Sequence, residues 1–471
     1  MAKTKRNKQN RWKKYPQAVI NDVLTVFDQH LDDESVAHAT LLLFPDEFLH
    51  CPELGWMHWT GTHWKRKGGR AAVKRAIRQT LRIAARLAVD RKKEALQKFA
   101  VGSRHRVNGA LFMLESILYI DIDEFDDEPY KLNTQNGVID LRDGVIYKHN
   151  GRTHRFTYCI PIDYNESADT SIIEAHLRDD LADPDDMVPF FKRILGYSIT
   201  GDTREEVLFY LQGPPRAGKD TIAGAVLQML GEPLAREVTF ETLTDKRYGD
   251  TNRADIATLR PARFVTGSEN NRKRPMNGAV IKNQTGGNQQ FVAMKGKDHF
   301  SFKPAYKLWL VSNWEIELDN RDDAAWGRLV LIAFPNNRLG KADPTRKART
   351  LAPAFQQALL TWAVQGAQEW LREGLQVPQC AEDRKNRQRG AVGPVVDFVK
   401  DLLKHSPGKW IETQAMADEY NDWCLLNGYE AEKPRKFIKT MMSSPLDYRR
   451  GQRVDPVTKK RQFSWLDVDF K

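Results

Sequence analysis

Cysteines, long apolar runs and paired metal-ligand spacings are scarce in this 471-residue sequence. Its four cysteines, at positions 51, 159, 380 and 424, lie far apart, so structural zinc is not expected and a reducing compartment fits. No apolar run is long enough to cross a bilayer, and the basic N-terminus lacks an apolar signal core. We therefore expect a cytoplasmic protein with no membrane partner.

The net charge of +11 is concentrated in two stretches where acids are absent or rare. Residues 1–15 contain seven lysines or arginines and no acid, which is typical of a flexible tail that holds nucleic acid loosely. Residues 65–106 contain only two acids, Asp90 and Glu94, and their apolar residues recur at helical spacing. We predict a helix there with a basic outer face. A solvated surface and a DNA or RNA contact both remain open.

A glycine-bracketed loop follows the apolar run 207–211 and precedes the helix-like run 222–227. This order of strand, loop, lysine and helix is the one that holds a nucleotide triphosphate, because loop and helix N–H groups face the phosphates. We therefore predict an ATP site in which Lys219 neutralises phosphate charge. Its residues are Gly213, Pro214, Pro215, Arg216, Ala217, Gly218, Lys219, Asp220 and Thr221.

One position of this loop departs from the usual pattern. Asp220 stands where a serine or threonine normally follows the lysine, and Thr221 comes one residue later. We expect Thr221 to meet Mg²⁺ directly or through water, with Asp220 adding negative charge nearby. Glu269, which ends a predicted strand over 263–269, is the carboxylate expected to hold Mg²⁺ and orient the attacking water.

Two later strands add further polar candidates. Asn313 lies at the tip of the predicted strand 306–313, where its amide would reach the γ-phosphate or the water. Arg328 precedes the apolar strand 329–334 and is our first choice for an arginine that reaches a neighbouring subunit's nucleotide; Arg321 is the second. The catalytic set is thus Lys219, Glu269, Asn313 and Arg328.

A basic hairpin is predicted between the second and third of these strands. Apolar residues over 290–302 flank a tip that carries Lys295, Lys297 and His299. Such a protruding hairpin would grip a phosphate backbone, whereas a solvated turn is the alternative.

The pattern divides the chain into five parts: a basic flexible tail (1–39), an α+β domain (40–195), an ATPase domain (196–375), a linker (376–393) and a C-terminal domain (394–471). Strands, loops and helices alternate in the ATPase part, which predicts an α/β fold around a covered parallel sheet. The last part shows three helical runs and a basic hairpin, which predicts a winged-helix-like DNA-binding domain.

The order of these pieces resembles the superfamily-3 helicases, specifically the C-terminal helicase region of phage- and plasmid-type primases. The resemblance covers about residues 40–471 and rests on the segments 132–141, 190–202, 281–287, 302–304 and 307–313, together with the loop. It implies an AAA+-like P-loop ATPase core that forms rings, commonly hexamers, and moves along single-stranded DNA. Because only about 40 residues precede the shared region, no primase domain is expected.

The resemblance also implies roles for single residues. It places Gly218, Lys219 and Thr221 in the phosphate loop and Glu269 in the acidic strand-end motif. Asn313 takes the sensor position, Arg328 the arginine-finger position, and Lys295 with Lys297 the DNA-binding hairpin.

We therefore expect an ATP- and Mg²⁺-dependent DNA helicase or translocase that serves the replication of a phage, plasmid or integrated mobile element. Its partners would be single-stranded and forked DNA, further copies of itself in a ring, and a separate primase or initiator protein. An origin-binding initiator that ATP switches without unwinding is the alternative. A small-molecule kinase is a weaker option, since only the Gly-Lys-x-Thr spacing favours it.

Overall fold

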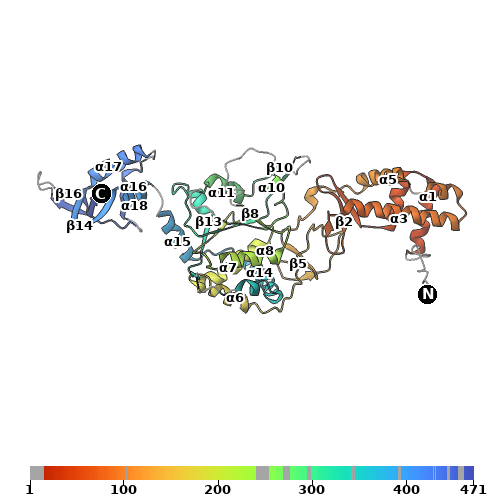
Figure 1. Cartoon of the computed structure of the whole chain (residues 1–471), viewed down its shortest axis with the longest axis horizontal. Helices are drawn as coiled ribbons and strands as arrows, with labels where there is room; N and C mark the ends of the chain where they lie inside the picture. Colours follow the sequence, from red (N-terminus) through yellow and green to blue (C-terminus); the bar gives the residue numbers. More distant parts are fainter. Residues whose placement is uncertain are drawn as a thin grey trace.

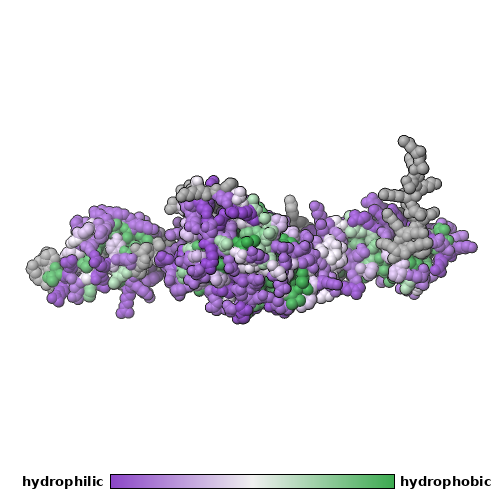
Figure 2. All heavy atoms as spheres, turned by 90° about the horizontal axis from the view of Figure 1, so that it is seen from below, coloured by the Kyte–Doolittle hydropathy of each residue, from purple (hydrophilic) through white to green (hydrophobic). Residues whose placement is uncertain are grey.

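The computed structural model arranges the chain as an elongated row of lobes, with α-helices at the N-terminal end and a mixed lobe at the C-terminal end (Figure 1). It describes residues 15–101, 103–239, 254–268, 276–293, 299–338, 340, 343, 345–390, 394–427, 429, 431–442, 446–454 and 461–471. Within these ranges, no helix combines the length and the apolar character that a membrane span requires. Hydrophilic side chains cover most of the face shown in Figure 2.

The N-terminal lobe packs helices over a small antiparallel sheet with the order β1-β2-β3. Its helices are α1 (Gln17–Gln29), α2 (Asp33–Leu43), α3 (Gly69–Asp90), α4 (Glu94–Phe99) and α5 (Arg104–Ile117). Its strands are β1 (Phe48–Cys51), β2 (Gly55–Trp59) and β3 (Trp64–Lys65). Buried side chains such as Val36, Ile77 and Leu114 give the helices of this lobe a core of their own. Cys51, Met57 and Trp64 of its strands instead enter an apolar cluster that extends into the central lobe.

The helices α1 and α2 correct one prediction. We predicted a flexible tail over 1–39, yet α1 lies entirely within that range and α2 begins there. The reason is an amphipathic pattern in α1, where Ile20, Val23, Leu24 and Phe27 all fall on one face and are buried in the lobe core. Residues 1–14 of that predicted tail lie outside the described part of the chain.

A second antiparallel sheet follows, with the order β4-β5-β6. The elements of this region are the short 3₁₀ helix η2 (Ile122–Glu124), β4 (Lys131–Thr134), β5 (Gly137–Asp140), β6 (Ile146–Tyr147), α6 (Ser171–Arg178) and α7 (Pro184–Ile199). Leu132 and Ile139 belong to the same apolar cluster as Phe209 and Trp309 of the central lobe. The predicted domain boundary at 195/196 therefore does not coincide with a break between hydrophobic cores.

The central lobe is built on a five-stranded parallel sheet with the order β13-β7-β12-β9-β8. Its strands are β7 (Leu208–Gln212), β8 (Ala235–Thr239), β9 (Phe264–Ser268), β12 (Lys307–Ser312) and β13 (Leu329–Ala333). Both faces are covered: Phe209 and Leu211 enter one apolar cluster, and the alternating Leu208 and Tyr210 enter the other. This confirms the predicted α/β fold with a parallel sheet at its core.

Helices cover the sheet on both faces. They are α8 (Lys219–Leu230), α10 (Ala254–Ala257), α11 (Gly278–Thr285), α12 (Asp323–Gly327), α13 (Thr345–Thr350), α14 (Pro353–Glu373) and α15 (Gln379–Gly390). Helices α7 and α14 pack against one another along their length, and α15 packs against β13. The last contact differs from our prediction of a linker over 376–393, because α15 occupies most of that segment.

The C-terminal lobe contains α16 (Pro394–Leu402), β14 (Leu403–Glu412), α17 (Thr413–Leu426), α18 (Pro434–Met442), β15 (Arg450–Val454) and β16 (Arg461–Phe470). Its strands form an antiparallel sheet with the order β14-β16-β15. A separate core buries aromatic side chains, among them Phe398, Tyr420, Phe437 and Trp465. The three helices and the hairpin predicted from the sequence are present, and their DNA-binding role stays a prediction.

Candidate functional site

The predicted phosphate loop lies at the carboxyl edge of the parallel sheet. β7 ends at Gln212, the loop crosses 213–218, and α8 begins at Lys219. Gln212 is in register with Ser312 of β12 and Ala333 of β13, so the loop emerges between two parallel neighbours. Ligands of open parallel sheets bind outside the carboxyl ends of the strands, and the N-terminus of α8 favours an anion there.

Lys219 crosses the inside of this loop. Although lysines are rarely buried, only 2 % of Lys219 is exposed. Its Nζ donates hydrogen bonds to the carbonyl oxygens of Gly213 at 2.7 Å and Pro214 at 2.9 Å, and to Oδ1 of Asn313 at 3.1 Å. Burial lowers the pKa of Lys219, while the charge of Asp220 acts in the opposite direction. The structure thus brings together two of the predicted catalytic residues, Lys219 and Asn313.

The predicted magnesium ligands begin in the first turn of α8. The N–H of Thr221 donates to the carbonyl oxygen of Gly218 at 3.0 Å, and the side chain of Asp220 is exposed. Glu269, the third predicted ligand, lies outside the described residues, directly after the end of β9. In the described part of the chain, no group of three or more His, Cys, Asp or Glu side chains could hold a metal. The residues fit Mg²⁺ only together with phosphate oxygens, which is how Mg²⁺ is usually held at nucleotides.

A buried carboxylate, that of Asp180, packs against the end of the loop at Gly218. Asp180, which follows α6, is fully buried, and a Cβ placed on Gly218 would lie 2.3 Å from its Oδ2. Gly218 also has φ +108°, a conformation that favours glycine. Position 218 therefore needs glycine for two reasons, one steric and one conformational.

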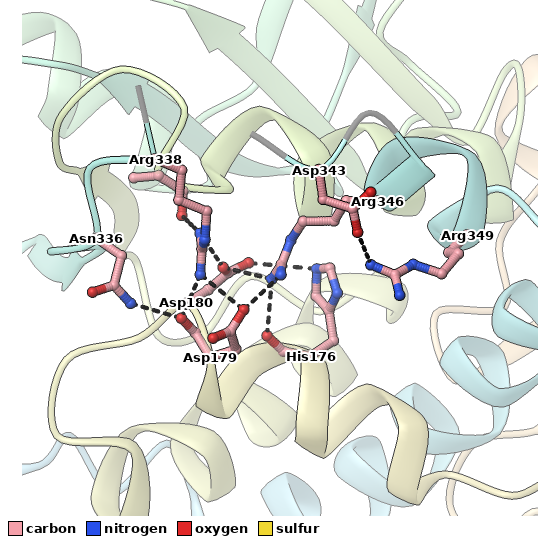
Figure 3. Close-up of polar contacts among 9 residues, drawn as sticks. His176, Asp179, Asp180, Asn336, Arg338, Asp343, Arg346 and Arg349 are labelled. Atoms are coloured by element: carbon pink, nitrogen blue, oxygen red, sulfur yellow. Dashed lines mark hydrogen bonds and ion pairs between the residues drawn. The ribbon is translucent and has the colours of Figure 1, made fainter. Parts of the chain in front are cut away.

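Two arginines hold Asp180 in place (Figure 3). Nη1 of Arg338 lies 2.7 Å from Oδ1 of Asp180 and donates to the carbonyl oxygen of Ala217 at 3.0 Å. Nη2 of Arg346, from α13, donates to the same Oδ1 at 2.6 Å. Both arginines also contact Asp179 Oδ2, at 2.9 and 2.6 Å. We call His176, Asp179, Asp180, Arg338 and Arg346 the Asp180 cluster.

Burial dominates the electrostatics of this cluster. It raises the pKa of Asp180, against the effect of Arg346 and Arg338. It also lowers the pKa of His176 to about 4, with a further contribution from the charge of Arg346. His176 is therefore neutral at neutral pH, with Nε2 3.4 Å from Oδ2 of Asp180. Sequence reasoning missed the cluster, since its members are separated by up to 170 positions and form no motif.

A cavity of about 390 Å³ adjoins the start of the loop. Its walls include Gln212, Gly213, Pro214, Phe334, Arg384 and Arg387. Arg384 is anchored by Asp183 at 2.6 Å, and the side chains of Gln388 and Gln212 are hydrogen-bonded. Helix α15, which the sequence suggested to be linker, thus contributes cationic side chains beside the loop.

Arg328 lies at the amino ends of the parallel strands, whereas the phosphate loop lies at their carboxyl ends. It follows α12, and its carbonyl oxygen accepts from the N–H of Leu208, the first residue of β7. Its guanidinium donates to Glu206 Oε2 at 2.7 Å, to the carbonyl oxygen of Lys282 at 2.7 Å and to Thr285 Oγ1 at 2.9 Å. A five-residue strand of roughly 16 Å separates it from the loop of its own chain. The structure does not bring Arg328 to Lys219 within one subunit.

The predicted hairpin has its two strands, β10 (Gln290–Ala293) and β11 (His299–Phe302), paired antiparallel. Val292, Phe300 and Phe302 are buried in the apolar cluster that covers one face of the central sheet. Lys295 and Lys297 lie outside the described residues, and of His299 only the backbone is described. The hairpin is confirmed, whereas its contact with DNA stays a prediction.

Comparison with known proteins gives relatives for this arrangement. Residues 37–193 match the family described as D5 N terminal like. The chain is 22 % identical over 324 residues to Putative helicase L207/L206 of Acanthamoeba polyphaga mimivirus, which covers 64 % of this chain and 34 % of that protein. It is 25 % identical over 260 residues to Putative helicase 022R of Frog virus 3 (isolate Goorha), and the match covers 50 % of this chain and 26 % of that protein. The chain thus spans about a third or less of the length of these relatives.

Among solved structures, the apo structure of the NrS-1 C terminal region (A form) aligns with a TM-score of 0.38 and 12 % identity over 73 % of this chain and 84 % of that one. A second apo structure of the same region gives a TM-score of 0.37. The chain therefore carries a D5 N-terminal-like region and is related to viral proteins that are named as putative helicases.

Proposed function

We propose that the chain is an ATP-dependent DNA helicase or translocase of the superfamily-3 type, acting in the replication of a phage, plasmid or integrated mobile element. The observation that carries the proposal is the buried Lys219 ammonium, which bonds to the carbonyls at the start of the 213–218 loop and to Asn313, the residue after β12. The viral relatives named as helicases support the same class.

The residues of the carboxyl edge would act on ATP as follows. N–H groups of the loop and of the first turn of α8 bind the phosphate oxygens, and Lys219 exchanges its carbonyl partners for them. Thr221, Asp220 and Glu269 would hold Mg²⁺, which would supply charge neutralisation at the phosphates. Asn313 positions the γ-phosphate or the attacking water, and Glu269 accepts the proton of that water.

Oligomerisation would complete this site. Arg328 lies at the sheet edge opposite its own loop, so it can stabilise the transition state only at the nucleotide of a neighbouring subunit in a ring, which we expect to be a hexamer. The hairpin with Lys295, Lys297 and His299 would contact single-stranded DNA, and the C-terminal lobe would contact forked DNA. A separate primase or initiator protein would supply the activities absent from such a motor.

The test is an ATPase assay with and without single-stranded DNA. We expect DNA-stimulated hydrolysis that Lys219→Ala abolishes, because the substitution removes the ammonium that bonds to the loop carbonyls of Gly213 and Pro214. Circular dichroism would show that the variant is folded. Unchanged hydrolysis in Lys219→Ala would disprove the proposal.

Asp220 favours a second candidate, an origin-binding initiator that ATP switches without unwinding. Its exposed carboxylate follows Lys219 directly, where it repels phosphate and can slow hydrolysis without preventing binding. Strand displacement on a forked substrate separates the two functions. Nucleotide-dependent DNA binding without displacement would favour the switch.

A further inference from the structure

Helix α3 carries four arginines on one exposed face of the N-terminal lobe. Arg75, Arg78, Arg82 and Arg86 follow one another at spacings of three, four and four residues, and all are exposed. At 1.5 Å per residue they extend over about 16 Å of helix. We call them the arginine stripe. In Figure 1, α3 runs along one side of this lobe.

The opposite face of α3 fixes the orientation of this stripe. Val73, Ile77, Leu81 and Ala84 are buried in the core of the N-terminal lobe. Because residues three and four apart share a helix face, the arginines cannot turn inward without exposing this core. The stripe is therefore a rigidly presented surface feature.

The stripe lacks counter-charges. Among the described residues, none of its four guanidiniums forms an ion pair, and α3 contains no acid before its last residue, Asp90. Several arginines of the central lobe do form ion pairs. Examples are the ion pairs Arg142–Asp140, Arg204–Asp202 and Arg328–Glu206.

This arrangement costs helix stability. Like charges at spacings of three and four residues repel one another on a helix surface. A polyanion laid along the stripe would relieve this repulsion and would release its own counterions. The exposed positions that extend the same face, Ala71 and Val89, add no hydrogen-bonding side chain beside the four arginines.

We propose that the arginine stripe of α3 is a sequence-independent binding surface for the phosphate backbone of nucleic acid. The buried face of α3 lies in a helical core that is distinct from the apolar clusters covering the sheet with the candidate nucleotide site. The proposal therefore goes beyond the proposed motor function and does not depend on ATP.

The test measures binding of the full chain, without nucleotide, to labelled single-stranded DNA and duplex DNA of equal length and mixed sequence. The variant is Arg78→Gln with Arg82→Gln. The matched control is Arg178→Gln with Arg372→Gln, which removes the same charge from exposed, ion-paired arginines of the central lobe. Glutamine preserves helix propensity, and circular dichroism checks the fold.

For the stripe variant we expect an affinity loss of about tenfold or more between about 50 and 200 mM salt. Because two phosphate contacts are lost, the slope of log affinity against log salt concentration should become less negative. The expected change in slope is roughly 1.4 on single strands and roughly 1.8 on duplex DNA. Arg78→Lys with Arg82→Lys should retain binding, because phosphate contacts need charge more than shape. The two DNA forms reveal which one the stripe holds.

Equal losses in the stripe variant and the control would overturn the proposal, since only net charge would then matter. An unchanged affinity and slope on both DNA forms would also overturn it and would leave an acidic protein surface as the partner. Neither result bears on ATP hydrolysis, so this test fails independently of the one for Lys219.

Discussion

Arg338 connects Asp180 to the candidate phosphate loop through a single nitrogen, Nη1, which lies 2.7 Å from the carboxylate and 3.0 Å from the carbonyl oxygen of Ala217. The contact ties the segment after β13 and the end of α6 to the same loop. A change in the charge of Asp180 should therefore alter the position of loop residues 217 and 218.

Asp180→Asn should destabilise the central lobe and weaken nucleotide binding. The substitution keeps the shape but removes the buried carboxylate that two part-buried guanidiniums share and leaves them only the exposed Asp179, which costs about 3 kcal/mol. Urea unfolding and titration with a fluorescent ATP analogue would measure both effects. The control is Asp179→Asn, whose side chain is 60 % exposed and contacts the same arginines, with an expected loss below about 1 kcal/mol. Equal losses in the two variants would argue against a special role of Asp180.

Gly218→Ala should abolish nucleotide binding. The new Cβ would lie 2.3 Å from Asp180 Oδ2 at a backbone φ of +108°, so the loop must move. Gly224→Ala is the matched control in α8, where an added Cβ meets open space and alanine should stabilise the helix by about 0.5–1 kcal/mol. Retained ATP-analogue binding in Gly218→Ala would show that the loop tolerates displacement.

Stability should fall on the acid side because of His176. Its pKa is about 4 in the folded chain against an ordinary 6.5, so the unfolded chain binds more protons between these values. The free energy of unfolding is unaffected by this histidine above pH 6.5. It falls by about 3 kcal/mol as the pH is lowered from 6.5 toward 4, because protonation of His176 then favours the unfolded chain. Urea midpoints measured across this range should depend less on pH in His176→Gln. His105→Gln, on the exposed side of α5, should keep the full slope.

Arg328→Gln should lower ATP hydrolysis by about 10³-fold or more if it acts across a subunit interface. Because the arginine and the loop lie at opposite sheet edges, mixing Arg328→Gln with Lys219→Ala subunits should restore part of the activity. Some interfaces would then contain both native residues. Arg321→Gln, whose arginine pairs with Asp319 at 3.2 Å, should stay active. Mixtures without any recovery would contradict action between subunits.

The sequence predicts best where one local pattern determines the outcome. The buried strands β7 and β12 appear as apolar runs, and the loop between β7 and α8 is marked by its glycines and Lys219. The pairing of β10 with β11 likewise follows from apolar residues around a basic tip. These features need no knowledge of distant contacts.

Features that depend on distant polar contacts could not be predicted. Helix α15 has almost no apolar face, and it is held by hydrogen bonds such as Gln388 to Gln212 and Arg389 to the carbonyl oxygen of Asn320. The Asp180 cluster joins residues up to 170 positions apart. Helix α1 differs from these features, because its apolar residues recur at helical spacing and could have been predicted from the sequence.

The separate core of the C-terminal lobe has a thermodynamic consequence. The buried residues around Phe398 and Trp465 form a cluster distinct from both clusters that cover the central sheet. A chain of this kind should not melt in one cooperative step, so calorimetry should resolve more than one transition. Asp180→Asn should shift only the transition of the central lobe. The melting temperature of the C-terminal lobe should stay constant in such variants. It therefore provides an internal reference for the shift that each substitution near the loop causes in the central lobe.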